Sequence, residues 1–245
     1  MSKIYEALEN IEAETKIVTK EKPSHQSRLV RRPHVWRSPV AGDIERIDDL
    51  CQRVESLLPS SGGKILQFIG SRKGEGTSTI VRQFAGFSAL KMGKSVLVLD
   101  TDGIVPVQHV LFDVHPKYCL NEVITDGGPI ERAYCQVADP RLSVCVVSGN
   151  SVSPVQVLND SGLWEKFRIN FDHVIIDSPP LEVSSDGLAI VRKADGVILV
   201  IEAEKTRWPV VQNLRDSIVE YGGNILGAVF NKRRYHVPGW IYKRL

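Results

Sequence analysis

The chain has 245 residues, of which 42% are hydrophobic, so it can bury a complete core, and we expect one domain with appendages rather than two domains. Its formal net charge is only +2, no apolar run is long enough to cross a bilayer, and the first residues are too polar for a signal peptide. The cysteines are scattered without a C-x-x-C pair, which argues against a zinc ribbon or a redox dithiol: Cys51, Cys119, Cys135 and Cys145. These features predict a cytoplasmic protein with no transmembrane segment of its own.

The first 42 residues are predicted to lie outside the main domain. Residues 1–16 carry Ile4, Leu8 and Ile11 at helical spacing, which predicts a short helix whose narrow apolar stripe docks either on its own domain or on a partner. Residues 17–42 combine prolines with basic and small polar residues, which predicts an extended linker. Such a basic block suits anionic lipid, nucleic acid or an acidic protein surface, and it is equally well explained as a solvated linker.

From residue 43 onward, apolar segments alternate between helical and strand character. After a helix at 43–58, strands are predicted at 64–69, 95–99, 142–147, 171–176, 196–201 and 225–230. Helices are predicted at 78–92, 184–193 and 209–221, and 154–170 is predicted to be mainly helical. Several strands are apolar at every position, as strands buried on both faces are. We therefore predict an α/β domain over residues 43–234, with a doubly wound, mainly parallel sheet and helices on both faces, followed by an aromatic and basic tail at 235–245.

A glycine-rich segment joins the first predicted strand to the following helix with nearly the spacing of a phosphate-binding loop. The pattern is G-x-x-x-x-G-K-[ST], because glycines let backbone N–H groups converge on phosphate, the lysine reaches the outer phosphates and the hydroxyl binds Mg²⁺. Ser71 stands at the first glycine position, Gly76 and Ser78 match, and Thr77 replaces the lysine. We predict that this phosphate loop binds a nucleotide, through Ser71, Arg72, Lys73, Gly74, Glu75, Gly76, Thr77, Ser78 and Thr79.

Polar residues also follow three other predicted strands. Asp100 and Asp102 come directly after the second strand, and Asp177 follows the strand at 171–176. Mg²⁺ prefers a few carboxylates together with nucleotide phosphates, so acids at the carboxyl ends of strands beside a phosphate loop indicate a metal site. Each acid alone is also typical of a helix cap or a turn. Asn231 follows the last strand, where its amide either contacts the base of a nucleotide or forms a simple turn.

Together these segments resemble the bacterial tyrosine kinases of capsule and exopolysaccharide synthesis, which are P-loop proteins related to partitioning ATPases. The resemblance is carried mainly by residues 73–79, 98–102 and 171–180, and it covers roughly residues 43–234. It implies the P-loop NTPase fold, with ATP and magnesium as cofactors. It also implies autophosphorylation of a tyrosine-rich tail within a ring-shaped homo-oligomer. The implied partner is a membrane protein of the polysaccharide co-polymerase type, which controls chain length and recruits the kinase to the inner face of the cell membrane.

The same resemblance assigns roles to individual side chains. Ser78 and Asp100 would ligate magnesium, and Asp177 would hold the metal through water. Asp100 and Asp102 would be the catalytic residues, acting at the metal and at the incoming tyrosine hydroxyl.

Four departures from the family pattern predict that kinase activity is weakened or lost. Thr77 cannot supply the charge of the missing lysine, although Arg72 or Lys73 offers a substitute. Ile104 stands where the family places an arginine, and the tail has only two tyrosines, at positions 235 and 242. In the family, an E-x-x-R-x-x-R motif before the first strand supports the ring. This motif aligns with Glu45, Asp48 and Cys51, so both arginines are missing.

Our leading interpretation is a divergent member of this kinase family that binds ATP and magnesium and regulates exopolysaccharide synthesis or export, as a weak kinase or a pseudokinase. Two alternatives remain open. One is a partitioning-type ATPase that dimerises on ATP, and the other is a non-enzymatic scaffold for a membrane polysaccharide assembly complex. No nucleic-acid partner is expected, because the sequence has no helix-turn-helix, zinc finger or aromatic-basic ladder.

Overall fold

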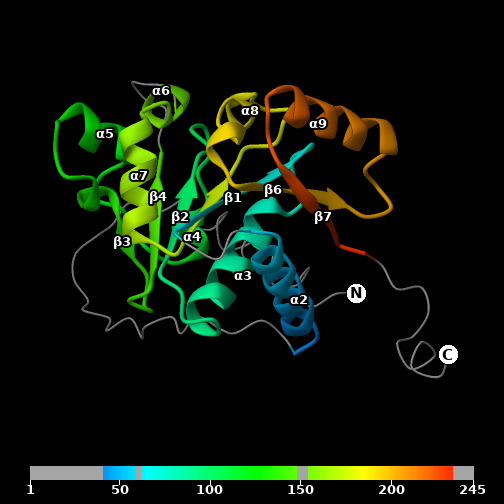
Figure 1. The fold of residues 1–245 in the computed structure, drawn as a ribbon, viewed down its shortest axis with the longest axis horizontal. Helices are drawn as coiled ribbons and strands as arrows, with labels where there is room; N and C mark the ends of the chain where they lie inside the picture. The colour runs from blue at the N-terminus through cyan, green and yellow to red at the C-terminus, as the bar shows by residue number, and fades with distance from the viewer. Residues whose placement is uncertain (1–40, 59–61, 148–153, 234–245) are drawn as a thin grey trace, which may run out of the picture. The chain divides into compact units, whose positions relative to one another are not determined.

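Seven strands form one sheet in the order β3-β4-β2-β5-β1-β6-β7 (Figure 1). The computed structural model describes residues 41–58, 62–147 and 154–233. Every strand pair is parallel except the short pairing of β3 with β4. The predicted mainly parallel sheet is therefore confirmed. The strands are β1 Lys64–Gly70, β2 Val96–Asp100, β3 Cys135–Gln136, β4 Leu142–Val146, β5 His173–Asp177, β6 Gly196–Glu202 and β7 Ile225–Asn231.

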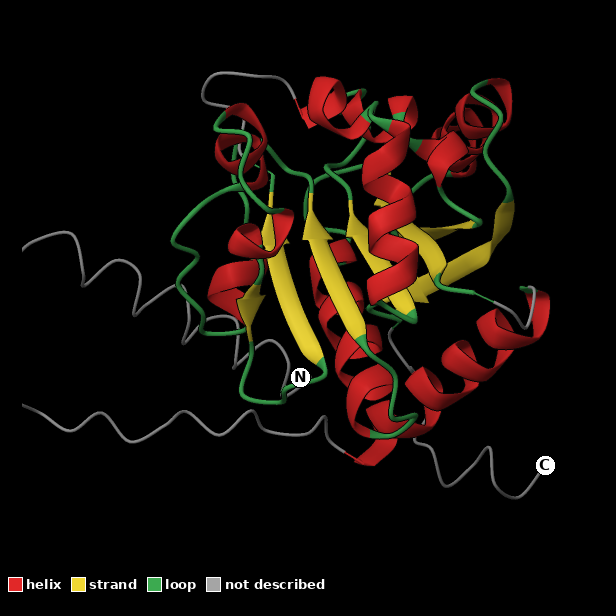
Figure 2. Cartoon of the chain, turned by 60° about the vertical axis from the view of Figure 1, so that its left-hand side comes forward, coloured by secondary structure: helices red, strands yellow, loops and turns green. Residues whose placement is uncertain are grey.

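Helices lie on both faces of this sheet, as the doubly wound fold requires (Figure 2). The longer helices are α2 Ala41–Leu57, α3 Thr77–Leu90, α7 Ser161–Asn170 and α9 Trp208–Glu220. The shorter ones are α4 Gln108–Leu111, α5 Leu120–Thr125, α6 Pro154–Leu158 and α8 Asp186–Ala189, with 3₁₀ turns η1 Ile130–Ala133 and η2 Val191–Lys193. Two helical predictions need correction in detail: residues 154–170 form two helices, and residues 184–193 form only α8 and η2.

The core divides between the two faces because successive strand side chains point to opposite sides of a sheet. In β1, Leu66 and Phe68 pack with α2 and α3, whereas Ile65 packs with α7 and Ile69 with α9. All seven residues of β1 are buried, so this central strand is covered on both faces. The phosphate loop thus begins at the end of a strand that is buried along its whole length.

Helix α2 is joined to the sheet by a polar cluster as well as by apolar packing. The Glu55 carboxylate pairs with the Lys64 ammonium at the start of β1, and its other oxygen lies 2.5 Å from His173 Nε2 at the start of β5. Ile47, Cys51 and Val54 of the same helix are buried against the core. This cluster lies at the amino ends of the strands, opposite the edge that carries the phosphate loop.

The predicted helix at 1–16, the linker up to residue 40 and the tail at 235–245 lie outside the described residues. Helix α2 begins at Ala41, two residues before the predicted domain start. Of the helices that the structure describes, none has the length and apolar character needed to span a bilayer.

Candidate nucleotide site

The phosphate loop connects β1 to α3 at the carboxyl edge of the sheet. Gly74 and Gly76 have φ values of 86° and 92°, a left-handed conformation that glycine adopts without steric cost. Gly76 is the N-cap of α3 and has no side chain to satisfy the first N–H groups of the helix. Those N–H groups carry the positive end of the helix dipole, which makes this helix start suitable for an anion such as phosphate.

Two carboxylates face each other at the ends of adjacent strands. Asp100 closes β2 and Asp177 closes β5, and the two residues are paired in the sheet register. Both are buried, at 0% and 3% exposure. Burial, followed by the negative charge of Asp100, raises the pKa of Asp177 to about 8. Burial likewise raises the pKa of Asp100 to about 6, even though three backbone N–H groups stabilise its ionised form. A bound cation would offset the repulsion between the two carboxylates.

The two acids differ in how many of their oxygens are already used. Both oxygens of Asp100 accept backbone N–H groups, from Asp102 at 3.2 Å and from Val107 and Gln108 at 2.8 Å each. Asp177 Oδ2 accepts the Gln108 amide at 2.7 Å, but its Oδ1 has no hydrogen-bond partner among the described residues. Asp177 Oδ1 is therefore the buried oxygen that is best placed to accept an additional ligand.

Ser78 at the start of α3 completes this group. Its side chain lies near enough to Asp177 to favour the charged form of that carboxyl, which opposes part of the rise in the pKa that burial causes. Hence the structure brings together Ser78, Asp100 and Asp177, the three residues predicted to hold magnesium. Across the described residues, no cluster of three or more His, Cys, Asp or Glu side chains forms a complete metal site. A bound magnesium ion would take few carboxylates from the protein and complete its shell with phosphate and water.

Asp102 lies beside the pair but has a different local role. Its Oδ1 accepts the N–H groups of Ile104 and Val105, both at 3.0 Å, so the carboxylate shapes the turn after β2. Ile104 is 72% exposed at this turn. Asp102 is half-buried, at the mouth of the site.

Gln108 is a part of the site that sequence reasoning missed. It is fully buried, and its amide nitrogen donates to Asp177 Oδ2 and, at 3.0 Å, to the Ser78 carbonyl. Gln108 thereby connects the acid of β5 to the start of α3. No sequence signal marks it, because a glutamine in a short helix between strands fits no motif.

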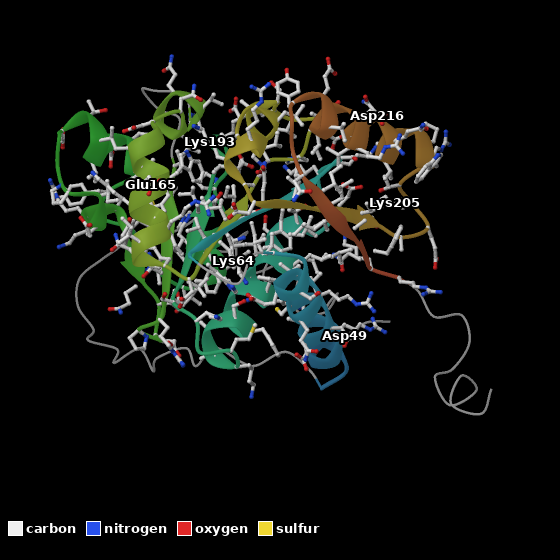
Figure 3. The ribbon with its side chains drawn as sticks, in the orientation of Figure 1. Asp49, Lys64, Glu165, Lys193, Lys205 and Asp216 are labelled. Atoms are coloured by element: carbon white, nitrogen blue, oxygen red, sulfur yellow. The ribbon has the colours of Figure 1, made fainter. Side chains whose placement is uncertain are left out.

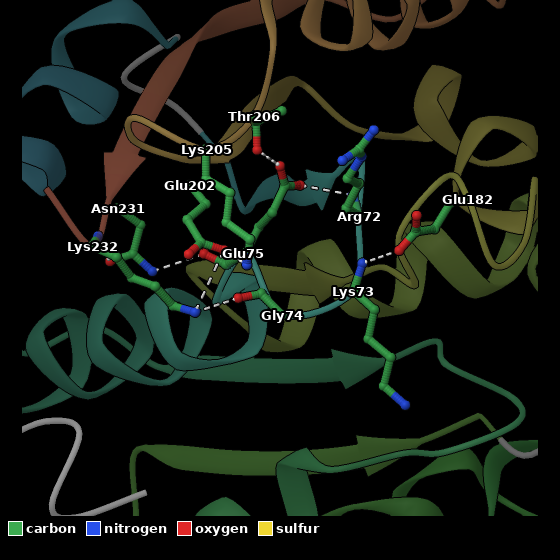
Figure 4. Close-up of polar contacts among 10 residues, drawn as sticks. All are labelled: Arg72, Lys73, Gly74, Glu75, Glu182, Glu202, Lys205, Thr206, Asn231 and Lys232. Carbon is green, nitrogen blue, oxygen red and sulfur yellow. Dashed lines mark hydrogen bonds and ion pairs between the residues drawn. The ribbon is translucent and has the colours of Figure 1, made fainter.

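The end of β7 holds the phosphate loop from the other side (Figure 4). Asn231 Nδ2 donates to the Glu75 carbonyl at 2.9 Å, and its Oδ1 accepts the backbone N–H of Lys232 at 2.9 Å. The Lys232 ammonium donates to the Gly74 carbonyl at 2.5 Å. The loop packs so closely here that a Cβ at Gly76 would lie 2.2 Å from Asn231 Nδ2. Asn231 therefore contacts the loop, its contact with a nucleotide base stays a prediction, and Lys232 is an addition to the candidate site.

The two cations proposed as substitutes for the missing lysine both lie on the exposed part of the loop. Arg72 and Lys73 are exposed, and Figure 4 shows the Lys73 side chain running away from Glu75. The Lys73 backbone N–H donates to Glu182 at 2.5 Å. The Thr77 hydroxyl lies over the base of the loop, 2.9 Å from where a Cβ at Gly70 would be.

No family model matches the chain, but single proteins do. The tyrosine-protein kinase YwqD of Bacillus subtilis is 24% identical over 211 residues, covering 85% of this chain and 89% of the relative. The tyrosine-protein kinase CpsD of Streptococcus pneumoniae serotype 4 is 27% identical over 194 residues, covering 77% of this chain and 83% of the relative. The chain is a homologue of the bacterial tyrosine-protein kinases. The predicted resemblance is thereby confirmed.

Solved structures place this kinase homologue in the P-loop NTPase fold. The kinase domain of Escherichia coli tyrosine kinase ETK superposes with a TM-score of 0.72 at 20% identity, covering 85% of this chain and 87% of that one. The chimerical protein CapA2B2 superposes with a TM-score of 0.71 at 21% identity, covering 78% of this chain and 85% of that one. The septum site-determining protein MinD of Pyrococcus horikoshii, solved with Mg-ADP, gives 0.60 at 16% identity, covering 74% and 76%. The predicted fold class is confirmed by these neighbours.

Proposed function

We propose that this kinase homologue binds magnesium and ATP at the phosphate loop and serves exopolysaccharide synthesis or export as a nucleotide-controlled regulator with weak kinase activity. One observation carries the proposal: the α3 start, Ser78 and the buried Asp100–Asp177 pair lie at the same edge of the sheet. The Mg-ADP in the structural neighbour MinD supports the same choice of ligand.

In this proposal the N–H groups of Gly76, Thr77, Ser78 and Thr79 contact the phosphates. The Ser78 hydroxyl and the free Oδ1 of Asp177 hold magnesium, directly or through water. When bound, the metal would neutralise phosphate charge and offset the repulsion between Asp100 and Asp177. Gln108 keeps Asp177 oriented toward Ser78. Asp102, at the mouth of the site, would orient the incoming tyrosine hydroxyl.

The weak activity follows from the charge that is missing. A preorganised cation at a transferring phosphoryl group is typically worth on the order of 10²- to 10³-fold in rate. Thr77 is neutral, and Lys232 is engaged with the Gly74 carbonyl and lies 3.7 Å from Glu202. Binding is less dependent on this charge, because backbone N–H groups and magnesium supply most of the phosphate contacts.

The first experiment measures the melting temperature of the purified chain with ATP and Mg²⁺, and with ATP and a chelator. A ligand that binds only the folded state must stabilise it, so we expect a rise with ATP and Mg²⁺ that the chelator removes. Ser78→Ala should reduce the rise, whereas Ser217→Ala on α9 should leave it unchanged. If saturating ATP and Mg²⁺ leave the melting temperature unmoved, the nucleotide proposal is wrong and the scaffold alternative is favoured.

A second experiment tests the kinase part with labelled ATP. We expect little transfer of label to tyrosine. Strong tyrosine labelling that is lost in Asp100→Ala would overturn the proposal of weak activity and make the chain a full kinase.

The structural likeness to MinD keeps a partitioning-type ATPase as the second candidate. That function predicts ATP-dependent dimers without tyrosine labelling, which sedimentation with and without ATP distinguishes. As a regulator, the chain would act in the cytoplasm, and a membrane protein of the co-polymerase type would recruit it to the inner face of the membrane.

A further inference from the structure

The Glu75 side chain lies inside the phosphate loop rather than in solvent. It is only 2% exposed, although it belongs to a surface loop. Its Oε2 accepts the backbone N–H of Ser71 at 2.6 Å and that of Arg72 at 2.9 Å. Its Oε1 accepts the Thr206 hydroxyl at 2.5 Å (Figure 4). One buried carboxylate therefore joins the first residues of the loop to the segment between β6 and α9.

The space for this carboxylate depends on Gly70, the last residue of β1. A Cβ at this position would lie 2.7 Å from Glu75 Oε2, closer than side-chain atoms pack. Gly70 itself is buried. Any side chain at residue 70 would push the Glu75 carboxylate out of the loop.

The rest of the loop is fixed through its carbonyl groups. Asn231 Nδ2 donates to the Glu75 carbonyl and Lys232 Nζ to the Gly74 carbonyl, both from the end of β7. The Glu75 carboxylate thus accepts the N–H groups at the start of the loop, while the side chains of Asn231 and Lys232 donate to carbonyl groups at its centre. Within the part of the chain that the structure describes, no side chain caps the N–H groups at the start of α3, since the N-cap residue is Gly76.

A carboxylate suits this position better than an amide. Two of the groups that point at the Glu75 carboxylate are backbone N–H groups, which can only donate, and the Thr206 hydroxyl donates as well. An ionised carboxylate accepts from all three through stronger, charge-assisted hydrogen bonds, whereas a glutamine makes neutral ones and must turn the Thr206 hydroxyl into an acceptor. Losing a hydrogen-bond partner costs more stability in a buried site than in solvent, because the donors that remain there cannot bond to water instead.

We propose that Glu75 is a positioning residue of the nucleotide site, which holds the first half of the phosphate loop against Thr206 so that the α3 start presents its N–H groups to phosphate. This inference rests on the proposed nucleotide function. It adds a dependence of nucleotide affinity on Thr206, which lies 131 residues away in sequence from Glu75.

The test compares Glu75→Gln, Thr206→Val and Thr206→Ser with the wild type, using a fluorescent ATP analogue with Mg²⁺ as the probe. Mutating the hydrogen-bond partners that orient metal ligands typically costs about 10- to 100-fold in metal affinity or activity, and by analogy we expect a loss of about 10-fold in affinity for Glu75→Gln. Thr206→Val should lose less, since both N–H bonds remain, and Thr206→Ser should bind like the wild type because it keeps the hydroxyl. Glu165→Gln on α7 is the matched control, and its affinity should not change (Figure 3).

Amide hydrogen exchange at Ser71 and Arg72, without nucleotide, supplies a readout that is independent of binding. Both amides should exchange faster in Glu75→Gln, with the melting transition showing that the variant is folded. Thr206→Val covers the case in which Glu75→Gln does not fold. Wild-type affinity and unchanged exchange in a folded Glu75→Gln would overturn the inference. If the wild type binds no ATP, the proposed function fails, and the exchange rates alone then decide whether Glu75 holds the loop.

Discussion

At the scale of single residues, Thr77 is the most informative position in the phosphate loop. Its side chain lies over Gly70, at the base of the loop. The neighbouring Arg72 and Lys73 are exposed. In our proposal the loop binds phosphate through its backbone, and a neutral threonine stands where a lysine would stabilise charge on a transferring phosphoryl group.

Restoring that cation should raise activity. We expect Thr77→Lys to increase phosphoryl transfer from ATP, to tyrosine or to water, by on the order of 10²- to 10³-fold. Transfer of label from γ-labelled ATP measures the change. Thr77→Met, which adds length without charge, should not increase the rate. An unchanged rate in a folded Thr77→Lys that binds ATP would show that another feature, such as Ile104, limits the chemistry.

Asp177 gives a second prediction at this scale, from the pH dependence of stability without ligand. Its pKa is about 8 in the folded protein against an ordinary value of 3.8. The folded state therefore retains a proton that the unfolded chain releases, so stability falls as pH rises from about 4 through 8. Asp177→Asn removes this loss of stability at high pH, and its amide oxygen can still accept the hydrogen bond from Gln108. At pH 8 it should melt at least about 2–4 °C above the wild type, a shift of about 1 kcal/mol for a domain of this size.

The difference between Asp177→Asn and the wild type should disappear near pH 4, where both side chains are neutral. Thermal unfolding across this pH range measures it. Asp216→Asn, on the exposed surface of α9, should follow the wild-type curve. Parallel curves for Asp177→Asn and the wild type would contradict the raised pKa.

At the scale of elements, α2 is fixed to the amino ends of β1 and β5 by one carboxylate. Glu55 contacts both Lys64 and His173, whose side chains are 9% and 1% exposed. Burial lowers the pKa of His173, while the adjacent Glu55 acts in the opposite direction. The helix thus depends on a polar cluster in which the Lys64 ammonium, whose side chain is only 9% exposed, loses its acidic partner if Glu55 is replaced.

We therefore expect Glu55→Gln to destabilise the protein by about 3 kcal/mol, because removing one partner leaves a buried charge uncompensated. Denaturant unfolding measures the free energy. Glu165→Gln, a change of the same chemistry at an exposed position of α7, should cost little. A loss as small as that of Glu165→Gln would mean that apolar packing alone holds α2.

At the scale of the whole molecule, the sheet order brings the loops after β1, β2, β5, β6 and β7 to one edge. Residues far apart in sequence meet there, including Glu75 with Thr206 and Gln108 with Asp177. The opposite edge carries the Glu55 cluster, which contributes to stability and lies away from the proposed chemistry.

Assembly is the property of the whole molecule for which the chain departs most from the family pattern. In α2, the family's two arginine positions are occupied by Asp48, which accepts a hydrogen bond from Gln52, and by Cys51, which is fully buried. A buried thiol cannot contact another subunit. We expect sedimentation to show no ring built through α2, and Asp48→Arg to leave the oligomeric state unchanged. A ring that Asp48→Arg dissolves would contradict this.

The sequence alone determined the fold class and the position of the phosphate loop. Apolar strands such as 196–201 must be covered on both faces, and a glycine-rich turn after the first strand has few other uses. It also predicted Ser78, Asp100 and Asp177 as neighbours, because the carboxyl ends of parallel strands meet at one edge.

Only the tertiary structure decided what these residues contact. Gln108, Thr206 and Lys232 reach the site from elements distant in sequence, and no local pattern encodes such contacts. The burial of Glu75 was equally hidden, since a charged residue in a loop is ordinarily solvated. The sequence supplied the groups of the candidate site, and packing of the sheet determined which of them are paired, which are buried and which, like Asp177 Oδ1, have no hydrogen-bond partner among the described residues.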